Sequence, residues 1–291
     1  MTSGFVLSVA AALVLGSYLV GVKRYFSHYP PTLLVTLTYA IAVAWYVPVV
    51  AVVVPVEQLV FSVSLRGVTV LAGTAGFTAL ALFAFYRALT IGDVSYVAPI
   101  SKIVPVFVLP LEVLLLGQRL SALQVAGVCV ATVAVYVANY RKESLFAPLQ
   151  QLARSRAGLL ALASAAAFGI VDIGKRVSMQ EIGVSPEGFV ITMLVLVTLF
   201  VAPSAVRNRR AVDWWDDRYL LTGAGLTLVV GQHLVAVAFE TLPASVVSPV
   251  VNTQGVVAVF LGSVLLGEPH VRVRLTAAGL AVVGIVFISL G

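Results

Sequence analysis

The chain has 291 residues, of which 60% are hydrophobic and only 10% are charged, and its net charge is +6. With a mean hydropathy of +1.07, this composition excludes a water-soluble domain, because one core could not hide so much apolar surface. The Lys and Arg residues stand in short groups between apolar runs, where they would face lipid headgroups, so the positive charge does not indicate a nucleic-acid partner. The lipid bilayer is the first partner that the sequence predicts.

The apolar runs are bounded by charges, prolines and polar clusters, and each is long enough to cross a bilayer, which takes about 20 residues. Strands of a β-barrel would alternate between apolar and polar residues, whereas stretches such as 125–137 show no such alternation. The sequence therefore predicts an all-α membrane protein with ten transmembrane helices, near residues 4–22, 32–54, 66–90, 94–116, 122–140, 157–177, 187–206, 219–241, 244–266 and 274–290.

The two halves of the chain match each other. Ala98-Pro99 recurs as Ser248-Pro249 and Leu116-Gly117 as Leu266-Gly267, both at an offset of 150 residues. The beginnings of the halves also match, because the run from Gly16 to Lys23-Arg24 resembles the run from Gly169 to Lys175-Arg176. We therefore expect a first five-helix repeat over 1–140, a connecting loop over 141–156 and a second five-helix repeat over 157–291.

Five helices in each copy is an odd number, so the second copy is predicted to be inverted relative to the first. Inverted repeats are typical of secondary transporters, in which the halves rock around one midplane site.

The stretches Ala98–Gly127 and Ser248–Gly279 each combine a helix-breaking residue, a Leu-Leu-Gly turn and a following helix that contains Gly. They resemble the EamA family of the drug/metabolite transporter superfamily, and the resemblance covers essentially the whole chain. Gln118 stands where that family usually has Glu, and Gly255 where it usually has Pro, so the copies have diverged. The resemblance implies a secondary carrier, an exporter or exchanger, for a small metabolite such as an amino acid or a related organic solute.

Other classes of function lack their sequence features. The chain has no HExxH, no GxSxG and no Cys/His cluster with metal-ligand spacing, so we predict no enzyme, no cofactor and no metal site. A channel would need a continuous polar stripe, whereas the polar residues here are isolated. A non-transporting scaffold or receptor stays open as an alternative.

Lys and Arg are divided unequally between the two sides of the predicted bundle. The connections on the N-terminal side carry Arg66, Arg119, Lys175 and Arg176, and those on the other side carry Lys23, Arg24, Arg141, Lys142, Arg154, Arg156, Arg207, Arg209, Arg210, Arg218, Arg272 and Arg274. Because cytoplasmic loops are rich in Lys and Arg, we expect a multi-pass protein of the cell membrane with both termini outside the cytoplasm. The resemblance implies the opposite, since ten-helix relatives have cytoplasmic termini.

Lys102 lies near the middle of the predicted helix 94–116, where a charge costs roughly 2.5–3.5 kcal/mol unless it faces protein or water. Prolines in this helix free backbone carbonyls, which lipid cannot satisfy but a cavity can. The offset of 150 places Asn252 opposite Lys102, with Gln254 nearby. We predict that these three residues bind substrate, with Lys102 as the counter-charge for an anionic group. The alternative is a Lys102 that sits in water or pairs with a carboxylate for assembly.

Two further residues are candidates for the site. His233, midway along 219–241, can exchange a proton near neutral pH and so couple transport to protons, or it can serve as an interhelical hydrogen-bonding group. Tyr96 follows the short turn before the helix that carries Lys102, where it either lines the mouth of the cavity or packs. Glu112 and Glu240 are further candidates for a proton carrier, but each lies near a helix end, where a carboxylate reaches interfacial water.

Two predictions concern structural roles. Asp172, Lys175 and Arg176 lie on neighbouring turns of one helix face, which favours an ion cluster at the membrane interface. Cys129 stands inside an apolar run, so we expect it to pack as a small residue.

Overall fold

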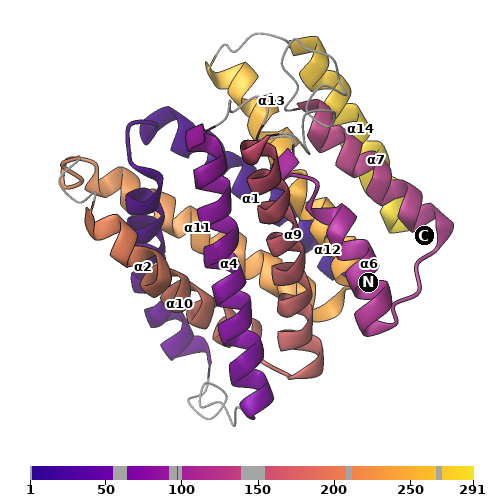
Figure 1. The fold of residues 1–291 in the computed structure, drawn as a ribbon, viewed down its shortest axis with the longest axis horizontal. Helices are drawn as coiled ribbons and strands as arrows, with labels where there is room; N and C mark the ends of the chain where they lie inside the picture. Colours follow the sequence, from indigo (N-terminus) through magenta and orange to yellow (C-terminus); the bar gives the residue numbers. More distant parts are fainter. Residues whose placement is uncertain are drawn as a thin grey trace.

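A computed structural model describes residues 2–54, 64–91, 97, 100–138, 155–207, 212–266 and 271–291. The regular structure of these residues is helical throughout (Figure 1). The elements are α1 (Thr2–Tyr25), α2 (Pro31–Val53), α4 (Leu65–Ile91), α6 (Val104–Leu116), α7 (Ala122–Ala138), α9 (Arg156–Arg176), η2 (Val177–Glu181), α10 (Pro186–Arg207), α11 (Arg218–Thr241), α12 (Ala244–Asn252), α13 (Gln254–Leu266) and α14 (Val271–Leu290). The expected connecting loop, 141–156, lies almost entirely outside the described residues.

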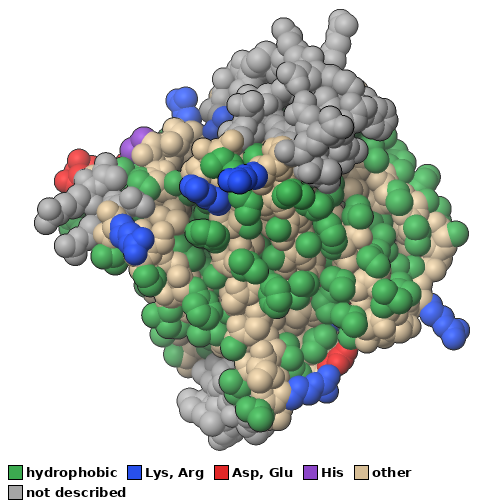
Figure 2. All heavy atoms as spheres, in the orientation of Figure 1, with side chains coloured by type: hydrophobic (Ala, Val, Ile, Leu, Met, Phe, Trp, Pro, Cys, Tyr) green, Lys and Arg blue, Asp and Glu red, His purple; other side chains and the backbone are tan. Residues whose placement is uncertain are grey.

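The described helices suit a membrane. Among the described residues, 7 helices are long and apolar enough to cross one, and shorter apolar helices cover 104–116, 122–137 and 275–290. Figure 2 shows hydrophobic side chains over most of the visible face, with Lys and Arg side chains near its edges. Large apolar side chains such as Val52 and Leu114, which are 87% and 80% exposed, would be unfavourable in water but match hydrocarbon. The chain is thus a multi-pass membrane protein whose described elements are helices.

Cys129 belongs to this outer surface. Its side chain is exposed on α7, so the prediction that it serves as a small packing residue is wrong. Hydropathy alone does not distinguish a helix face that meets lipid from one that meets another helix, because both are apolar.

Local sequence explains several helix ends. Pro31 opens α2, where a missing backbone N–H is harmless because the first turn has no acceptor for it. The side chain of Ser155 accepts a hydrogen bond from the backbone N–H of Gly158 and caps the start of α9. Gly117 ends α6 with a φ of 63°, a left-handed conformation that glycine adopts without strain.

Two predicted helices are each broken in the middle. In the first half, Ser101 is helical, Lys102 forms a turn, and α6 begins at Val104. In the second half, α12 ends at Asn252, Thr253 forms a turn, and α13 begins at Gln254. The runs 94–116 and 244–266 are therefore interrupted helices, as the prolines and Gly255 within them indicate, and their breaks fall at positions related by the offset of 150.

α7 and α14 are the last helices of the two halves and run antiparallel along each other. Gly127 of α7 lies beside Ile288, whereas Ala131, one turn further along α7, lies beside Gly284, one turn earlier in α14. A Cβ on Gly127 would lie 2.7 Å from the backbone nitrogen of Ile288, and one on Gly284 would lie 2.6 Å from that of Ala131. Small residues thus allow two backbones to approach closely, as is common between helices in membranes.

Contacts between the halves come in exchanged pairs. α1 packs on α11 and α13, and the matching α9 packs on α4 and α6. Gly16 of α1 lies against Val257 of α13, and its counterpart Gly169 of α9 lies against Phe107 of α6. Residues 107 and 257 are themselves related by the offset of 150, so each half makes the same contact with the other.

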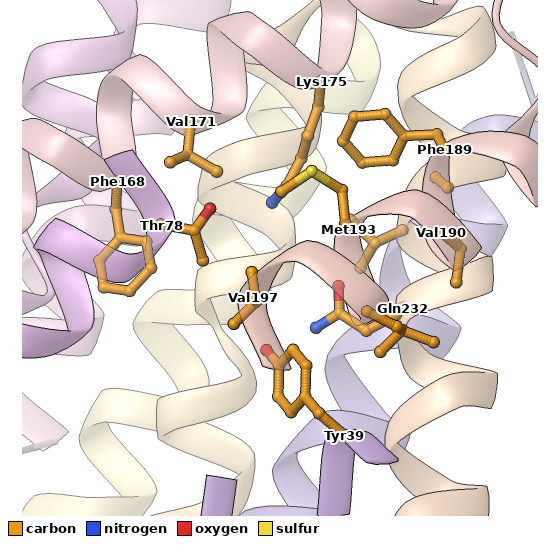
Figure 3. Close-up of a pocket in the computed structure, with 13 residues that line it drawn as sticks. Tyr39, Thr78, Phe168, Val171, Lys175, Phe189, Val190, Met193, Val197 and Gln232 are labelled. Carbon is orange, nitrogen blue, oxygen red and sulfur yellow. The ribbon is translucent and has the colours of Figure 1, made fainter. Parts of the chain in front are cut away.

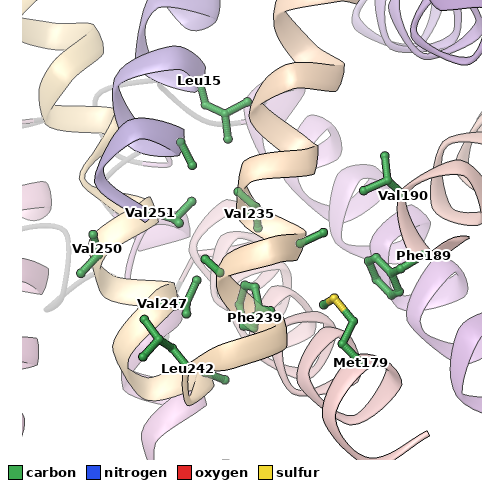
Figure 4. Packing of buried hydrophobic residues seen from close by; sticks show 14 of the residues in the cluster. Leu15, Met179, Phe189, Val190, Val235, Phe239, Leu242, Val247, Val250 and Val251 are labelled. Atoms are coloured by element: carbon green, nitrogen blue, oxygen red, sulfur yellow. The ribbon is translucent and has the colours of Figure 1, made fainter. Parts of the chain in front are cut away.

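α12 is the buried centre of the bundle. Its residues from Ala244 to Val251 are all buried, and Figure 4 shows Val247 close to Phe239 of α11. The broken segment that carries Asn252 therefore lies inside the protein and not against lipid.

Candidate functional site

A cavity of about 290 Å³ lies between the two halves, at the breaks. Lys102 lines it from the first break, and Asn252 and Gln254 line it from the second. α1, α2, α4, α9 and α11 supply the remaining walls. The structure therefore brings together three of the residues singled out by sequence, while Tyr96 lies outside the described residues. The volume is near the lower end of ligand pockets, which hold roughly 300–1,000 Å³.

The polar groups at the breaks differ in how far they are satisfied. The side-chain amide of Asn252 donates hydrogen bonds to the carbonyl oxygen and the hydroxyl of Ser248, at 2.9 and 3.4 Å. The side chains of Lys102 and Gln254 make no hydrogen bond or ion pair with any residue in the described part of the chain. Two side chains with donors are thus available to a ligand.

Asp172 and Lys175 of α9 also line the cavity. Their charged atoms are 2.8 Å apart, and the side chains are only 10% and 20% exposed. The Lys175 ammonium also lies 5.3 Å from the centre of the Phe239 ring, a cation–π contact. The pairing of Asp172 with Lys175 agrees with the sequence prediction, and the structure adds that the pair borders the cavity.

A second, smaller hollow of about 90 Å³ shares part of this wall. Lys175, Thr78, Tyr39 and Gln232 line both spaces. Figure 3 shows these four side chains, from α9, α4, α2 and α11, directed toward one another. The Asp172–Lys175 pair therefore stands where the two hollows meet.

His233 is not among the residues that line either hollow. Its Nδ1 lies 2.8 Å from the Tyr46 hydroxyl of α2, whereas the preceding residue, Gln232, faces the cavity. Neighbouring residues of a helix point about 100° apart, so α11 directs the amide inward and the imidazole toward α2. The sequence argument gave a role to His233 and none to its neighbour Gln232, since position along the chain does not reveal which face is inward.

Glu112 of α6 is completely buried. Its carboxylate pairs with the Arg176 guanidinium of α9 and accepts hydrogen bonds of 2.6 Å from the backbone N–H groups of Ala244 and Ser245. These two N–H groups open α12, where a carboxylate both fills unused donors and meets the positive end of the helix dipole. The expectation that Glu112 reaches interfacial water is wrong, because α9 and α12 cover it.

Gln118 completes what we call the Glu112 cluster: Glu112, Arg176, Gln118 and the first turn of α12. Arg176 donates a second hydrogen bond, of 3.2 Å, to the side-chain oxygen of Gln118. The Arg176 Nε donates a further hydrogen bond, of 3.1 Å, to the side-chain oxygen of Gln180, so one guanidinium faces one carboxylate and two neutral amides. The cluster joins the two halves at the end of α12 away from Asn252, about 12 Å from it at 1.5 Å per residue.

On the opposite side, the α1–α2 turn meets the segment before α11. The Tyr29 hydroxyl donates a 2.8 Å hydrogen bond to the carboxylate of Asp217, and His28 Nε2 lies 3.7 Å from the same oxygen. Burial and this carboxylate both raise the pKa of Tyr29, so the hydroxyl stays protonated and remains a donor. Contacts between the halves therefore exist on both sides of the cavity.

Comparison with known proteins agrees with this architecture. The family model described as the EamA-like transporter family matches residues 2–140 and 155–290. A solved structure described as "Crystal structure of protein" is similar to this one, with a TM-score of 0.81 and 16% sequence identity. The match covers 100% of this chain and 97% of the other chain. At this identity the likeness shows the fold alone. No curated protein matches the sequence.

Proposed function

Because the chain belongs to the EamA-like transporter family, within the drug/metabolite transporter superfamily, we propose that it is a secondary transporter of a small organic metabolite, working as an exporter or exchanger. The observation that carries the proposal is the cavity at the two matching breaks, lined by Lys102, Asn252 and Gln254. Broken helices at corresponding places in two halves are the feature that transporters use to build a midplane site.

The proposal includes ten spans in two inverted repeats, over 1–140 and 157–291. The antiparallel course of α7 and α14 supports the inversion, because these helices end matching halves and run in opposite directions. The exchanged contacts Gly16–Val257 and Gly169–Phe107 support a two-fold relationship between the halves. Such a relationship gives the molecule two similar routes to the cavity, one from each side of the membrane.

Alternating access assigns a role to the Glu112 cluster. The cluster ties α6 of the first half to α9 and α12 of the second on one side of the cavity. Opening the cavity toward that side separates these elements, so the cluster breaks or rearranges in each cycle.

We also propose that the protein lies in the cell membrane with both termini outside the cytoplasm, on the basis of the division of Lys and Arg.

Solute exchange in proteoliposomes tests the transport function. Purified protein is first screened against metabolites by thermal shift, and each solute that stabilises it is loaded into vesicles to drive uptake of the labelled compound. We expect saturable uptake that Asn252→Leu abolishes by filling the cavity. Val264→Leu is the matched control, because Val264 is 66% exposed on the outer surface.

Three results distinguish the alternatives. Uptake no faster than in empty vesicles, for every stabilising solute, contradicts a transporter and favours a scaffold or receptor. Passage that never saturates favours a channel. Uptake that survives Asn252→Leu shows that solute crosses elsewhere in the molecule.

A further inference from the structure

We infer that the solute is a small organic monocarboxylate with an aromatic or compact apolar body, and that its carboxylate pairs with Lys102. This inference rests on the proposed transport function and adds the class of substrate. Its basis is the balance of charge around the cavity and the composition of the walls.

The described residues that line the cavity include three with ionic side chains: Lys102, Asp172 and Lys175. Asp172 and Lys175 lie 2.8 Å apart and neutralise each other. Lys102 has no such partner in the described part of the chain. With Lys102 protonated, the described lining carries one uncompensated positive charge, in surroundings of low polarity where a bound anion offsets the cost of that charge.

A solute with a single negative charge balances this site. A zwitterionic amino acid has no net charge, so it would leave the positive charge of the site uncompensated. Its ammonium would also need a carboxylate, and Asp172 is already engaged by Lys175. A dicarboxylate would bring a second negative charge without a free cation. Charge balance therefore favours a monoanion over both.

The side chain of Gln254 can hold the second carboxylate oxygen. It lines the cavity at the opposite break and makes no hydrogen bond with described residues. Its amide donates in a fixed direction, while the flexible Lys102 supplies charge from the other half. One carboxylate thus bridges the two breaks.

The remaining walls suit an apolar body. Aromatic rings come from five helices and consist of Tyr18, Tyr39, Phe85, Tyr86, Phe168 and Phe239. Rings of this kind bury large apolar area and favour stacked or edge-on contact with another ring. The cavity of about 290 Å³ leaves room for a compact solute only.

A set of three probes with one carbon skeleton tests the inference: 3-phenylpropanoate, 3-phenylpropanamide and phenylalanine. Binding to purified protein is measured by titration calorimetry, and exchange is measured in proteoliposomes. We expect 3-phenylpropanoate to bind at least tenfold more tightly than either of the others. Lys102→Gln should remove this preference, and Lys102→Arg should retain it.

Arg66→Gln is the control, because it also removes one positive charge but from a side chain that is 65% exposed and distant from the cavity lining. Equal binding of the amide or the amino acid overturns the inference, as does unchanged binding in Lys102→Gln. Failure of 3-phenylpropanoate to bind likewise overturns it. In each case the proposed function stands if another solute exchanges saturably, and fails only if none does.

Discussion

Gly169 of α9 lies so close to Phe107 of α6 that a Cβ on the glycine would be 2.8 Å from the Cβ of the phenylalanine. The contact between Gly16 and Val257 repeats this arrangement with the two halves exchanged. In both places, the first helix of one half rests on the helix that follows the break in the other. Glycine thus sets the distance between the halves beside the cavity.

Substituting alanine at this contact should destabilise the protein. Gly169→Ala forces the two helices apart, and overpacking of this kind costs about 1–3 kcal/mol. Gly73→Ala is the matched control, since nothing lies within 4 Å of a Cβ there; it should be neutral or stabilising, because alanine favours helix over glycine. The free energy of unfolding in mixed detergent and SDS measures both. Equal stability of the two variants would show that the close contact does not hold in the membrane protein.

The glycines of α7 and α14 should act on the same contact. Gly127→Ala and Gly284→Ala each separate the helices, and the two sites touch, because a Cβ on Gly127 would lie 2.8 Å from the Gly284 carbonyl oxygen. The double variant should therefore lose less stability than the sum of the single losses. A double-mutant cycle on unfolding free energies measures the difference. Strict additivity would mean that the helices do not separate as a unit.

Glu112→Gln should destabilise the protein by about 3–5 kcal/mol, because it leaves the buried Arg176 without its counter-charge. Glu181→Gln removes the partner of Arg66 in an exposed pair, with side chains 35% and 65% exposed, and should change stability by less than about 1 kcal/mol. Unfolding free energies of the two variants test the contrast. A small effect at Glu112 would show that its pair with Arg176 contributes little to stability.

His233 should prove structural. Both Tyr46→Phe and His233→Gln lose the hydrogen bond between α2 and α11, which is worth about 0.5–1.5 kcal/mol. We expect both variants to exchange solute with the pH dependence of the original protein, since His233 does not line the cavity. Uptake rates measured from pH 5.5 to 8, over about the range in which imidazole titrates, provide the test. Loss of the pH dependence in His233→Gln alone would make this residue a proton carrier.

The membrane orientation can be tested with the single cysteine removed. Cys129→Ala gives a chain without thiols, into which one cysteine is added at either end. If the division of Lys and Arg sets the orientation, both added cysteines should react with an impermeant maleimide in intact cells. Reaction only after the membrane is opened would place both ends in the cytoplasm, as the resemblance to the family implies.

Much of the fold follows from the sequence, because each feature that predicts it is local. Apolar length marks the helices, and the repeat offset by itself relates Lys102 to Asn252. The break at Lys102 agrees with the same local chemistry, since Pro105 stands in the first turn of α6, where its missing backbone N–H leaves no acceptor unpaired. The breaks, in turn, locate the cavity.

The rest depends on neighbours that are distant in sequence. Glu112 stands near a helix end, which suggests water, yet α9 and the first turn of α12 cover it. Asp172 and Lys175 show the spacing of an ordinary surface pair, and only the packing of α4 and α11 against α9 makes them part of the cavity. Depth along a helix can be counted from the sequence, but the direction that a side chain faces cannot.

α12 spans only nine residues, and it carries Asn252 at one end and the Glu112 contact at the other. A short, enclosed helix of this kind moves as a rigid unit, since its packed neighbours leave it little freedom to bend. Under the proposed function, solute bound beside Asn252 is thermodynamically linked to the Glu112 contact, and a change that favours one state of the contact alters solute affinity by the same factor. On that proposal, about two and a half turns of backbone connect the solute site to the contact that joins the two halves.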